Sequence, residues 1–173
     1  MQPIVLNYNL ASYGKQLWSA STQAAQAVSV GLATTYTGLC LSNPNKSNAN
    51  LYLLRVGLAL SAAPAATASF GIIGGISTTD VAHTTPGTVA STFLGYAGPH
   101  TGLVDTAATI PTPTWLEQLM GGFTVATLPS SPLSIFDFQG SWVIPPGGFI
   151  AVGALTAASG LWSMVWFEGP LNG

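Results

Sequence analysis

The chain has 173 residues, a mass of 17.7 kDa, three basic and five acidic side chains, and a formal net charge of −2. Charged residues make up 5%, against about a quarter in ordinary soluble domains, so no basic surface is expected for binding nucleic acid through its phosphates. Five Trp and seven Phe need burial, which excludes a typical disordered segment, and the single cysteine, Cys40, excludes a disulfide scaffold.

The first 29 residues differ from the rest, because they are rich in Gln, Ala and Ser and hold few β-type runs. Residues 15–28 are compatible with one short helix, since Ala and Gln favour it, but their apolar spacing is too loose for an amphipathic helix. The alternative, which we favour, is an extended arm that packs on a neighbouring molecule, with Leu17 and Trp18 as its anchors. The chain is therefore divided into an N-terminal arm over 1–29 and one domain over 30–173.

From residue 30 onward, short runs rich in Thr, Val, Ile, Leu and aromatic residues alternate with turns rich in Gly, Pro and Asn. These runs predict about eight or nine strands, at 31–42, 51–60, 69–77, 88–96, 102–110, 122–128, 134–144, 149–156 and 161–168. No crossover helices are visible, which excludes parallel βαβ units. The pattern predicts an all-β fold, an antiparallel two-sheet jelly-roll sandwich with an N-terminal arm.

One helical signal interrupts this pattern. Thr114-Trp115-Leu116-Glu117 fits a capping box, and Leu119 and Met120 follow it. It predicts one or two helical turns, and the alternative is a short strand between Pro113 and Gly121.

Candidate catalytic and metal-binding residues are sparse. His83 and His100 lie in stretches rich in Gly, Pro and Thr, which favours solvated loop histidines, and there is no Gly-x-Ser-x-Gly elbow. Cys40 has no Cys or His nearby, and the carboxylates close to the β-type runs do not cluster in sequence: Asp80, Asp105, Asp137 and Glu168. We expect no catalytic residue, no cofactor and no metal.

Aromatic residues and one arginine stand out within the strands. Trp115, Trp142, Trp162 and Trp166 offer aromatic surface for a sugar, but the strand positions of the last three favour the core or an interface. Arg55 is the only arginine and lies inside an apolar strand, where a buried guanidinium must be paired. Asp137 and Glu168 are its candidate partners, within the subunit or across an interface.

The scarcity of charge predicts assembly. A compact monomer of this mass exposes roughly 8,000 Å², so eight charges leave about one per 1,000 Å². The chain then either covers itself with neutral Ser, Thr, Asn, Ala and Gly or buries surface in an assembly, and we favour the second. The expected interface residues are Leu17, Trp18, Arg55, Trp162 and Trp166.

Membrane and export signals are not expected. The uncharged stretch Val56 to Thr79 contains Pro64, four glycines and several Ser and Thr, which argues against a membrane span. The start of the chain lacks a basic segment and a long apolar run, so no signal peptide is expected, and a lone cysteine fits synthesis in a reducing cytoplasm.

The order of segments resembles a known family. The segments are 37–44 (TGLCLSNP), 47–50 (SNAN), the apolar strand 51–60, 61–66 (SAAPAA), 138–149 (FQGSWVIPPGGF) and 160–168 (GLWSMVWFE). Over residues 30–173 this resembles small structural proteins of tailed bacteriophages with a jelly-roll like that of tumour necrosis factor. Several of these are head decoration, or cement, proteins.

The resemblance implies a virion protein on the capsid surface that forms a homotrimer, sits between capsomers, binds the major capsid protein and stabilises the head. It also implies that Pro145-Pro146-Gly147-Gly148 turns between the last two long strands, and that the arm reaches over a neighbouring capsid subunit. The low charge departs from a mode of binding dominated by salt bridges. A tail or fibre-tip protein that binds a host receptor is the alternative, and an enzyme acting on glycan polymers is a third hypothesis that lacks paired carboxylates.

Overall fold

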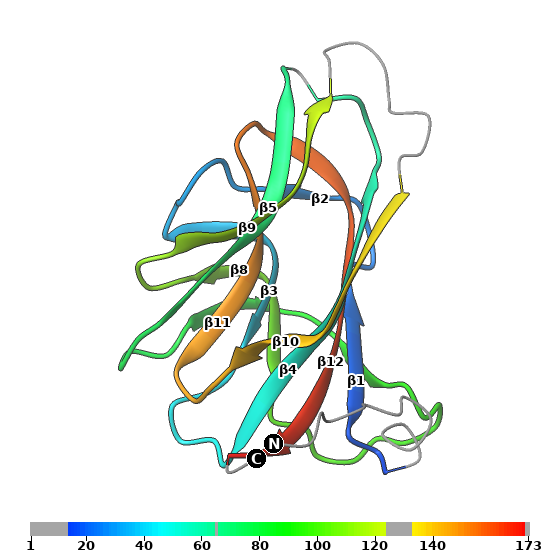
Figure 1. Ribbon diagram of the computed structural model, residues 1–173, viewed down its shortest axis with the longest axis vertical. Coiled ribbons are helices and arrows are strands. Elements are labelled where there is room, and N and C mark those ends of the chain that lie inside the picture. The colour runs from blue at the N-terminus through cyan, green and yellow to red at the C-terminus, as the bar shows by residue number, and fades with distance from the viewer. Residues whose placement is uncertain (1–13, 65, 124–132, 172–173) are drawn as a thin grey trace.

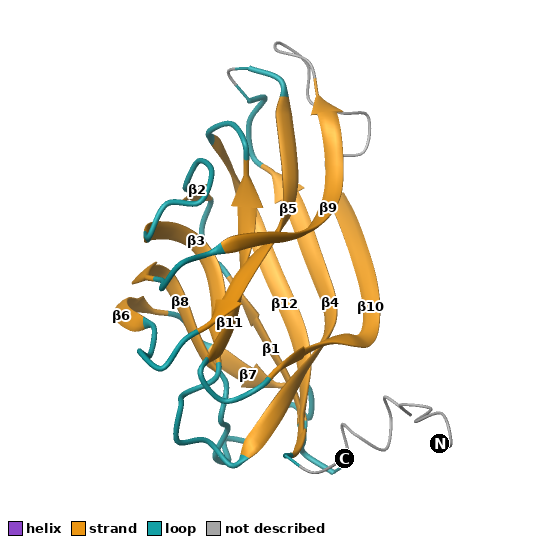
Figure 2. Cartoon of the chain, turned by 60° about the vertical axis from the view of Figure 1, so that its left-hand side comes forward, coloured by secondary structure: helices purple, strands orange, loops and turns teal. Residues whose placement is uncertain are grey.

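A computed structural model describes residues 14–64, 66–123 and 133–171 and shows an all-β protein (Figure 1). The described residues form strands in two layers, with no helix among them (Figure 2). The strands are β1 (Leu17–Ser21), β2 (Gln26–Val28), β3 (Thr35–Ser42), β4 (Ala49–Leu60), β5 (Ala68–Ile76), β6 (Ala82–Pro86), β7 (Val89–Ser91), β8 (Leu103–Thr109), β9 (Thr114–Phe123), β10 (Leu133–Ile144), β11 (Gly148–Ala154) and β12 (Ala158–Pro170).

The strands pair antiparallel in two sheets. Sheet A has the order β10-β4-β12-β1-β7, with β2 also paired to β12, and sheet B has the order β6-β8-β3-β11-β5-β9. The eight strands β1, β3, β4, β5, β9, β10, β11 and β12 have jelly-roll connectivity. The first, third, sixth and eighth of them lie in sheet A and the other four in sheet B. The predicted jelly-roll sandwich is therefore confirmed, and β6, β7 and β8 are additions between β5 and β9.

The main core lies between the two sheets, because each sheet turns one apolar face inward. In β12, Trp162, Met164 and Trp166 are fully buried, while the residues between them are half-buried or exposed, which is the period-two pattern of a strand. Phe70 of sheet B meets Trp162 of sheet A with ring centroids 5.9 Å apart. A fully buried aromatic or aliphatic side chain of this kind stabilises the fold by about 1.5–3 kcal/mol.

Part of the outer face of sheet B is covered by the chain itself. In β11, Ile150 and Val152 point into the main core, so Phe149 and Ala151 point the other way, yet both are buried. They belong to a second cluster with Tyr36, Cys40, Ile73, Val81, Ala108 and Ile110. Val81 and Ile110 lie in connections outside the strands, so these connections fold over the face and close it.

Two ionisable groups in this second cluster predict a loss of stability at alkaline pH. Burial, helped by the nearby Asp105 carboxylate, raises the pKa of the Cys40 thiol above its ordinary 9.0, and burial raises the pKa of Tyr36 above its ordinary 10.0. The unfolded chain therefore releases these protons at lower pH than the folded one. The free energy of unfolding should hold up to about pH 9 and then fall by about 1.4 kcal/mol per pH unit, and about twice as steeply above pH 10. Urea titrations of the native chain and of Cys40→Ala between pH 8 and 11 test this, and an equal fall between pH 9 and 10 in both proteins would contradict it.

The N-terminal segment is extended rather than helical. Residues 14–29 form β1, which lies between β12 and β7, and β2, which pairs with β12. The described part of the predicted arm is therefore integrated into sheet A, because Leu17 and Trp18 find buried positions on their own sandwich. The extended conformation that we favoured for this segment is confirmed and the helical alternative over 15–28 is wrong, while residues 1–13 lie outside the described residues.

Two other expectations changed. The capping-box signal at Thr114 does not start a helix, since residues 114–123 form the edge strand β9 against β5. The tertiary pairing of this apolar segment with an open sheet edge outweighs the local signal. The turn at Pro145-Pro146-Gly147-Gly148 joins β10 to β11, one connection earlier than the resemblance implied. The predicted strand over 122–128 lies mostly outside the described residues, which resume at 133.

Candidate functional site

Among the described residues, the outer face of sheet A carries large apolar side chains that remain exposed to solvent. Because Trp162, Met164 and Trp166 of β12 face the core, the alternate residues Leu161, Ser163 and Val165 face outward. Their register partners extend the face across β4 and β10. We call the following set the sheet A face: Arg55, Gly57, Ala59, Ile135, Asp137, Val143, Leu161, Ser163 and Val165.

Large apolar side chains on the sheet A face reach solvent. Ile135 is 58% exposed, Leu161 47% and Val143 44%. Ile135 is opposite Gly57, which is in turn opposite Ser163, so only small side chains continue this row. Exposed apolar side chains gathered on one face make it a candidate protein interface.

The same face continues over a small buried cluster beside β1. Leu17 and Leu54 are buried there, and Val165 and Phe167 pack on them. The ring of Tyr52 lies 5.8 Å from that of Phe167, centroid to centroid. The predicted interface residue Leu17 is thus under this face, although it is only 5% exposed.

Arg55 lies on this surface, and the prediction that it is buried is wrong. It is exposed, because it points away from the core between the buried Leu54 and Val56. Its register partner in β10 is Asp137, one of the two predicted partners. Both residues line a depression of about 360 Å³ together with Leu17 and Val165.

Glu168 has a different role from the one predicted. Its Oε1 accepts hydrogen bonds from the backbone N–H of Thr101 (3.0 Å), the backbone N–H of Gly102 (2.8 Å) and the indole Nε1 of Trp166 (3.1 Å), while Oε2 also accepts from Thr101 (2.8 Å). The carboxylate thus fastens the segment before β8 to the end of β12. It is not the partner of Arg55.

The tryptophans predicted at an interface belong to the core. Trp18 is 2% exposed, and Trp162 and Trp166 are 0% exposed. They fill the space between the sheets and cannot contact the surface of a partner subunit. The residues that replace them as interface candidates are Ile135, Leu161 and Val143. For Ile135, the alternation of residues in β10 already indicated an outward position. Ile135 shares a face with Asp137, while Phe136 and Phe138 face the core.

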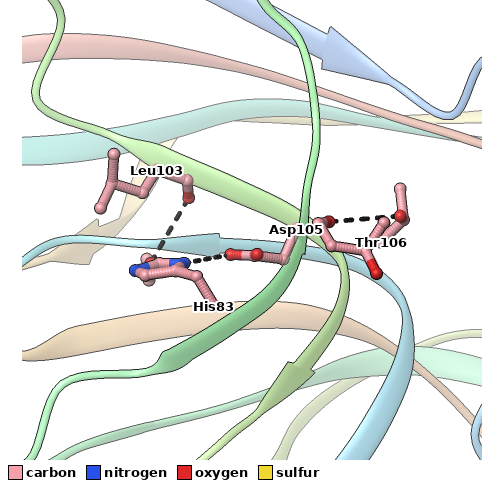
Figure 3. A network of polar contacts seen from close by, with 6 residues as sticks. His83, Leu103, Asp105 and Thr106 are labelled. Carbon is pink, nitrogen blue, oxygen red and sulfur yellow. Dashed lines mark hydrogen bonds and ion pairs between the residues drawn. The ribbon is translucent and has the colours of Figure 1, made fainter.

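A histidine–aspartate pair lies at the opposite sheet (Figure 3). His83 of β6 contacts the Asp105 carboxylate of β8 through Nδ1 and Oδ2, and Asp105 is completely buried. The other oxygen, Oδ1, has no hydrogen-bond partner among the described residues. The expectation of a solvated loop histidine is therefore wrong for His83. The signal missed was the position of Asp105 opposite Cys40 in sheet B, where burial demands a partner.

The remaining candidates stay apart. His100 is exposed, and its Nδ1 lies 2.9 Å from the Gly102 carbonyl oxygen. Its ring contacts that of Trp18 in a tilted arrangement, with centroids 5.2 Å apart. Asp80 Oδ1 accepts hydrogen bonds from the backbone and side chain of Asn45, at 2.7 and 2.9 Å. Within residues 14–64, 66–123 and 133–171, no three His, Cys, Asp or Glu side chains come together in a metal-binding arrangement. The same ranges contain no helix with the length and apolarity of a membrane span.

The functional proposal rests on the geometry of the structure and on the sequence, because comparisons with known proteins give no relative. No family model, no curated protein and no solved structure matches this chain.

Proposed function

We propose that this chain is a structural protein of a tailed-phage virion, a jelly-roll subunit that forms a homotrimer and decorates the capsid between capsomers, where it binds the major capsid protein and stabilises the head. The observation that carries the proposal is the exposed apolar surface of the sheet A face, where Ile135, Val143 and Leu161 are all more than two-fifths exposed in the described structure. The very low charge and the family resemblance of residues 30–173 point the same way.

The physical argument is a contrast between the two outer faces. Val81, Ile110 and their neighbours close part of the outer face of sheet B, whereas the described residues on the sheet A side bury only the small cluster around Leu17 and Leu54. Apolar surface that leaves water stabilises an assembly in proportion to its area. A trimer buries one such face on each subunit and presents three copies of any capsid contact, which raises avidity through effective concentration. Because the trimer binds only the assembled lattice, it shifts the equilibrium toward the intact head.

The test measures mass and salt dependence together. Light scattering of the purified protein should give three times the mass of the chain, and co-sedimentation with capsids of its phage should be nearly unchanged between low and high salt, since apolar contacts are weakly screened. A monomer that fails to sediment with capsids would overturn the proposal. Release at moderate ionic strength would overturn its apolar mechanism.

A tail or fibre-tip protein that binds a host receptor is the second candidate. One observation favours it: Trp115 lies on an edge strand with 38% of its surface exposed. Electron microscopy of virions labelled with an antibody to this chain separates the two, because label on the head supports decoration and label on the tail supports the receptor-binding alternative.

A further inference from the structure

The indole of Trp115 contacts the outer surface of sheet B through its six-membered ring. Trp115 is opposite Ile73 in the pairing of β9 with β5. A Cβ placed on Gly71 would lie 3.1 Å from Cζ3 of the indole, and one placed on Gly153 would lie 2.8 Å from Cζ3 and 2.9 Å from Cη2. The six-membered part of the ring therefore rests on the backbones of β5 and β11, which only glycine allows at this distance. The ring is held in place while 38% of the residue remains open to solvent.

A depression of about 330 Å³ lies beside this ring. Trp115 and Leu155 contribute apolar surface, and Leu155 is itself 57% exposed. Ser69, Glu117 and Gln118 contribute a hydroxyl, a carboxylate and an amide to the same lining. The combination of a mostly apolar wall and a few polar groups is typical of small-molecule sites, whose volumes start at about 300 Å³.

Glu117 is positioned by a residue of the other sheet. Its Oε2 accepts a hydrogen bond of 2.7 Å from Nε1 of Trp142, which lies in β10 at the edge of sheet A. Across the described part of the chain, Oε1 accepts no hydrogen bond, so it is available to a ligand. A carboxylate oxygen accepts from hydroxyl groups, and the Gln118 amide both donates and accepts.

The chemistry of these groups selects the ligand class. A pyranose ring has an apolar face of C–H groups that packs on an aromatic ring, and a rim of hydroxyl groups that donate and accept hydrogen bonds. An anionic ligand would be repelled by Glu117, and the described lining offers no basic side chain to offset it. We propose that Trp115, Glu117 and Gln118 form a binding site for a neutral hexopyranose unit. This site does not depend on the proposed assembly, because it lies on sheet B.

The experiment measures the Nε1–H resonance of Trp115 by nuclear magnetic resonance while sugars are added. Protein labelled with ¹⁵N-tryptophan is titrated with the methyl glycosides of glucose, galactose, mannose and N-acetylglucosamine, each to about 50 mM, which detects dissociation constants in the millimolar range. We expect at least one sugar to shift the Trp115 Nε1–H resonance and to leave those of the buried Trp162 and Trp166 unchanged. Trp115→Ala and Glu117→Ala should each weaken binding at least tenfold, measured on the sugar's saturation-transfer signal, and Trp115→Phe should retain part of it.

Two further variants make the test decisive. Gly153→Ala should displace the indole and weaken binding while leaving Trp115 in the chain, whereas Leu94→Ala, at a residue that is 89% exposed elsewhere, should change nothing. Tighter binding of an oligosaccharide than of its methyl glycoside would identify a polymer as the source of the sugar, and equal binding would identify a single ring. The inference is overturned if no sugar in the panel shifts the Trp115 resonance, or if Trp115→Ala binds as well as the native chain.

Discussion

Leu161→Asp is expected to convert the proposed trimer into folded monomers. Leu161 is 47% exposed at the sheet A face, opposite Ala59 of β4, and makes no contact in the main core. If the face is buried between subunits, each copy of the variant must place a carboxylate in an apolar contact, without a basic residue beside it other than Arg55. The cost is about 3 kcal/mol per interface, or about a hundredfold in each dissociation constant. Light scattering across a dilution series measures the change in mass.

The matched control is Leu94→Asp, which adds the same charge at a residue that is 89% exposed and outside the sheet A face. It should leave the mass unchanged. Near-ultraviolet circular dichroism should be native in both variants, because neither residue belongs to the core. An assembly that survives both Leu161→Asp and Ile135→Asp would show that the sheet A face is not the contact between subunits.

Sequence periodicity predicted the fold class because most of the long strands carry their own signal, whereas β1, β2, β6 and β9 were not among the predicted strands. The runs at 51–60, 134–144, 149–156 and 161–168 match β4, β10, β11 and β12 closely, since Gly, Pro and Asn mark their ends. The two helical signals, at 15–28 and 114–120, failed for a common reason. Both segments lie where the sandwich can accept another strand, next to β12 and β5, and pairing there outweighs local helix preference.

The sequence predicted the residues of the candidate site less well than the fold. A strand buried on one face and a strand buried on both look alike when the outward residues are small or apolar. Trp162 and Trp166 were therefore taken for interface residues although they face the core, and Arg55 was taken for a buried residue although it faces solvent. Which outer face is closed by connecting segments depends on contacts between distant parts of the chain, such as Val81 and Ile110 over sheet B.

His83→Ala should lower the free energy of unfolding by about 2–3 kcal/mol, because it removes the partner of the Asp105 carboxylate. Asp105 is completely buried, its Oδ1 has no partner in the described structure, and His83 supplies the partner of Oδ2. Removal of the imidazole leaves a buried carboxylate without compensation, and the partial exposure of the histidine side chain, 32%, places the cost below the roughly 3–5 kcal/mol of fully buried pairs. The urea midpoint should fall with an unchanged slope. Hydrogen exchange should also quicken in β6, whose five residues are all exposed.

Comparison variants separate the charge effect from a general loss of side-chain contacts. Thr84→Ala, at an exposed neighbour in β6, should change stability by less than about 0.5 kcal/mol. Asp105→Asn placed on top of His83→Ala removes the unpaired charge, so the double variant should be more stable than His83→Ala alone, a non-additive result. If His83→Ala costs no more than Thr84→Ala, the imidazole does not compensate the buried carboxylate. In that case β6 is held to sheet B by its backbone pairing with β8 alone.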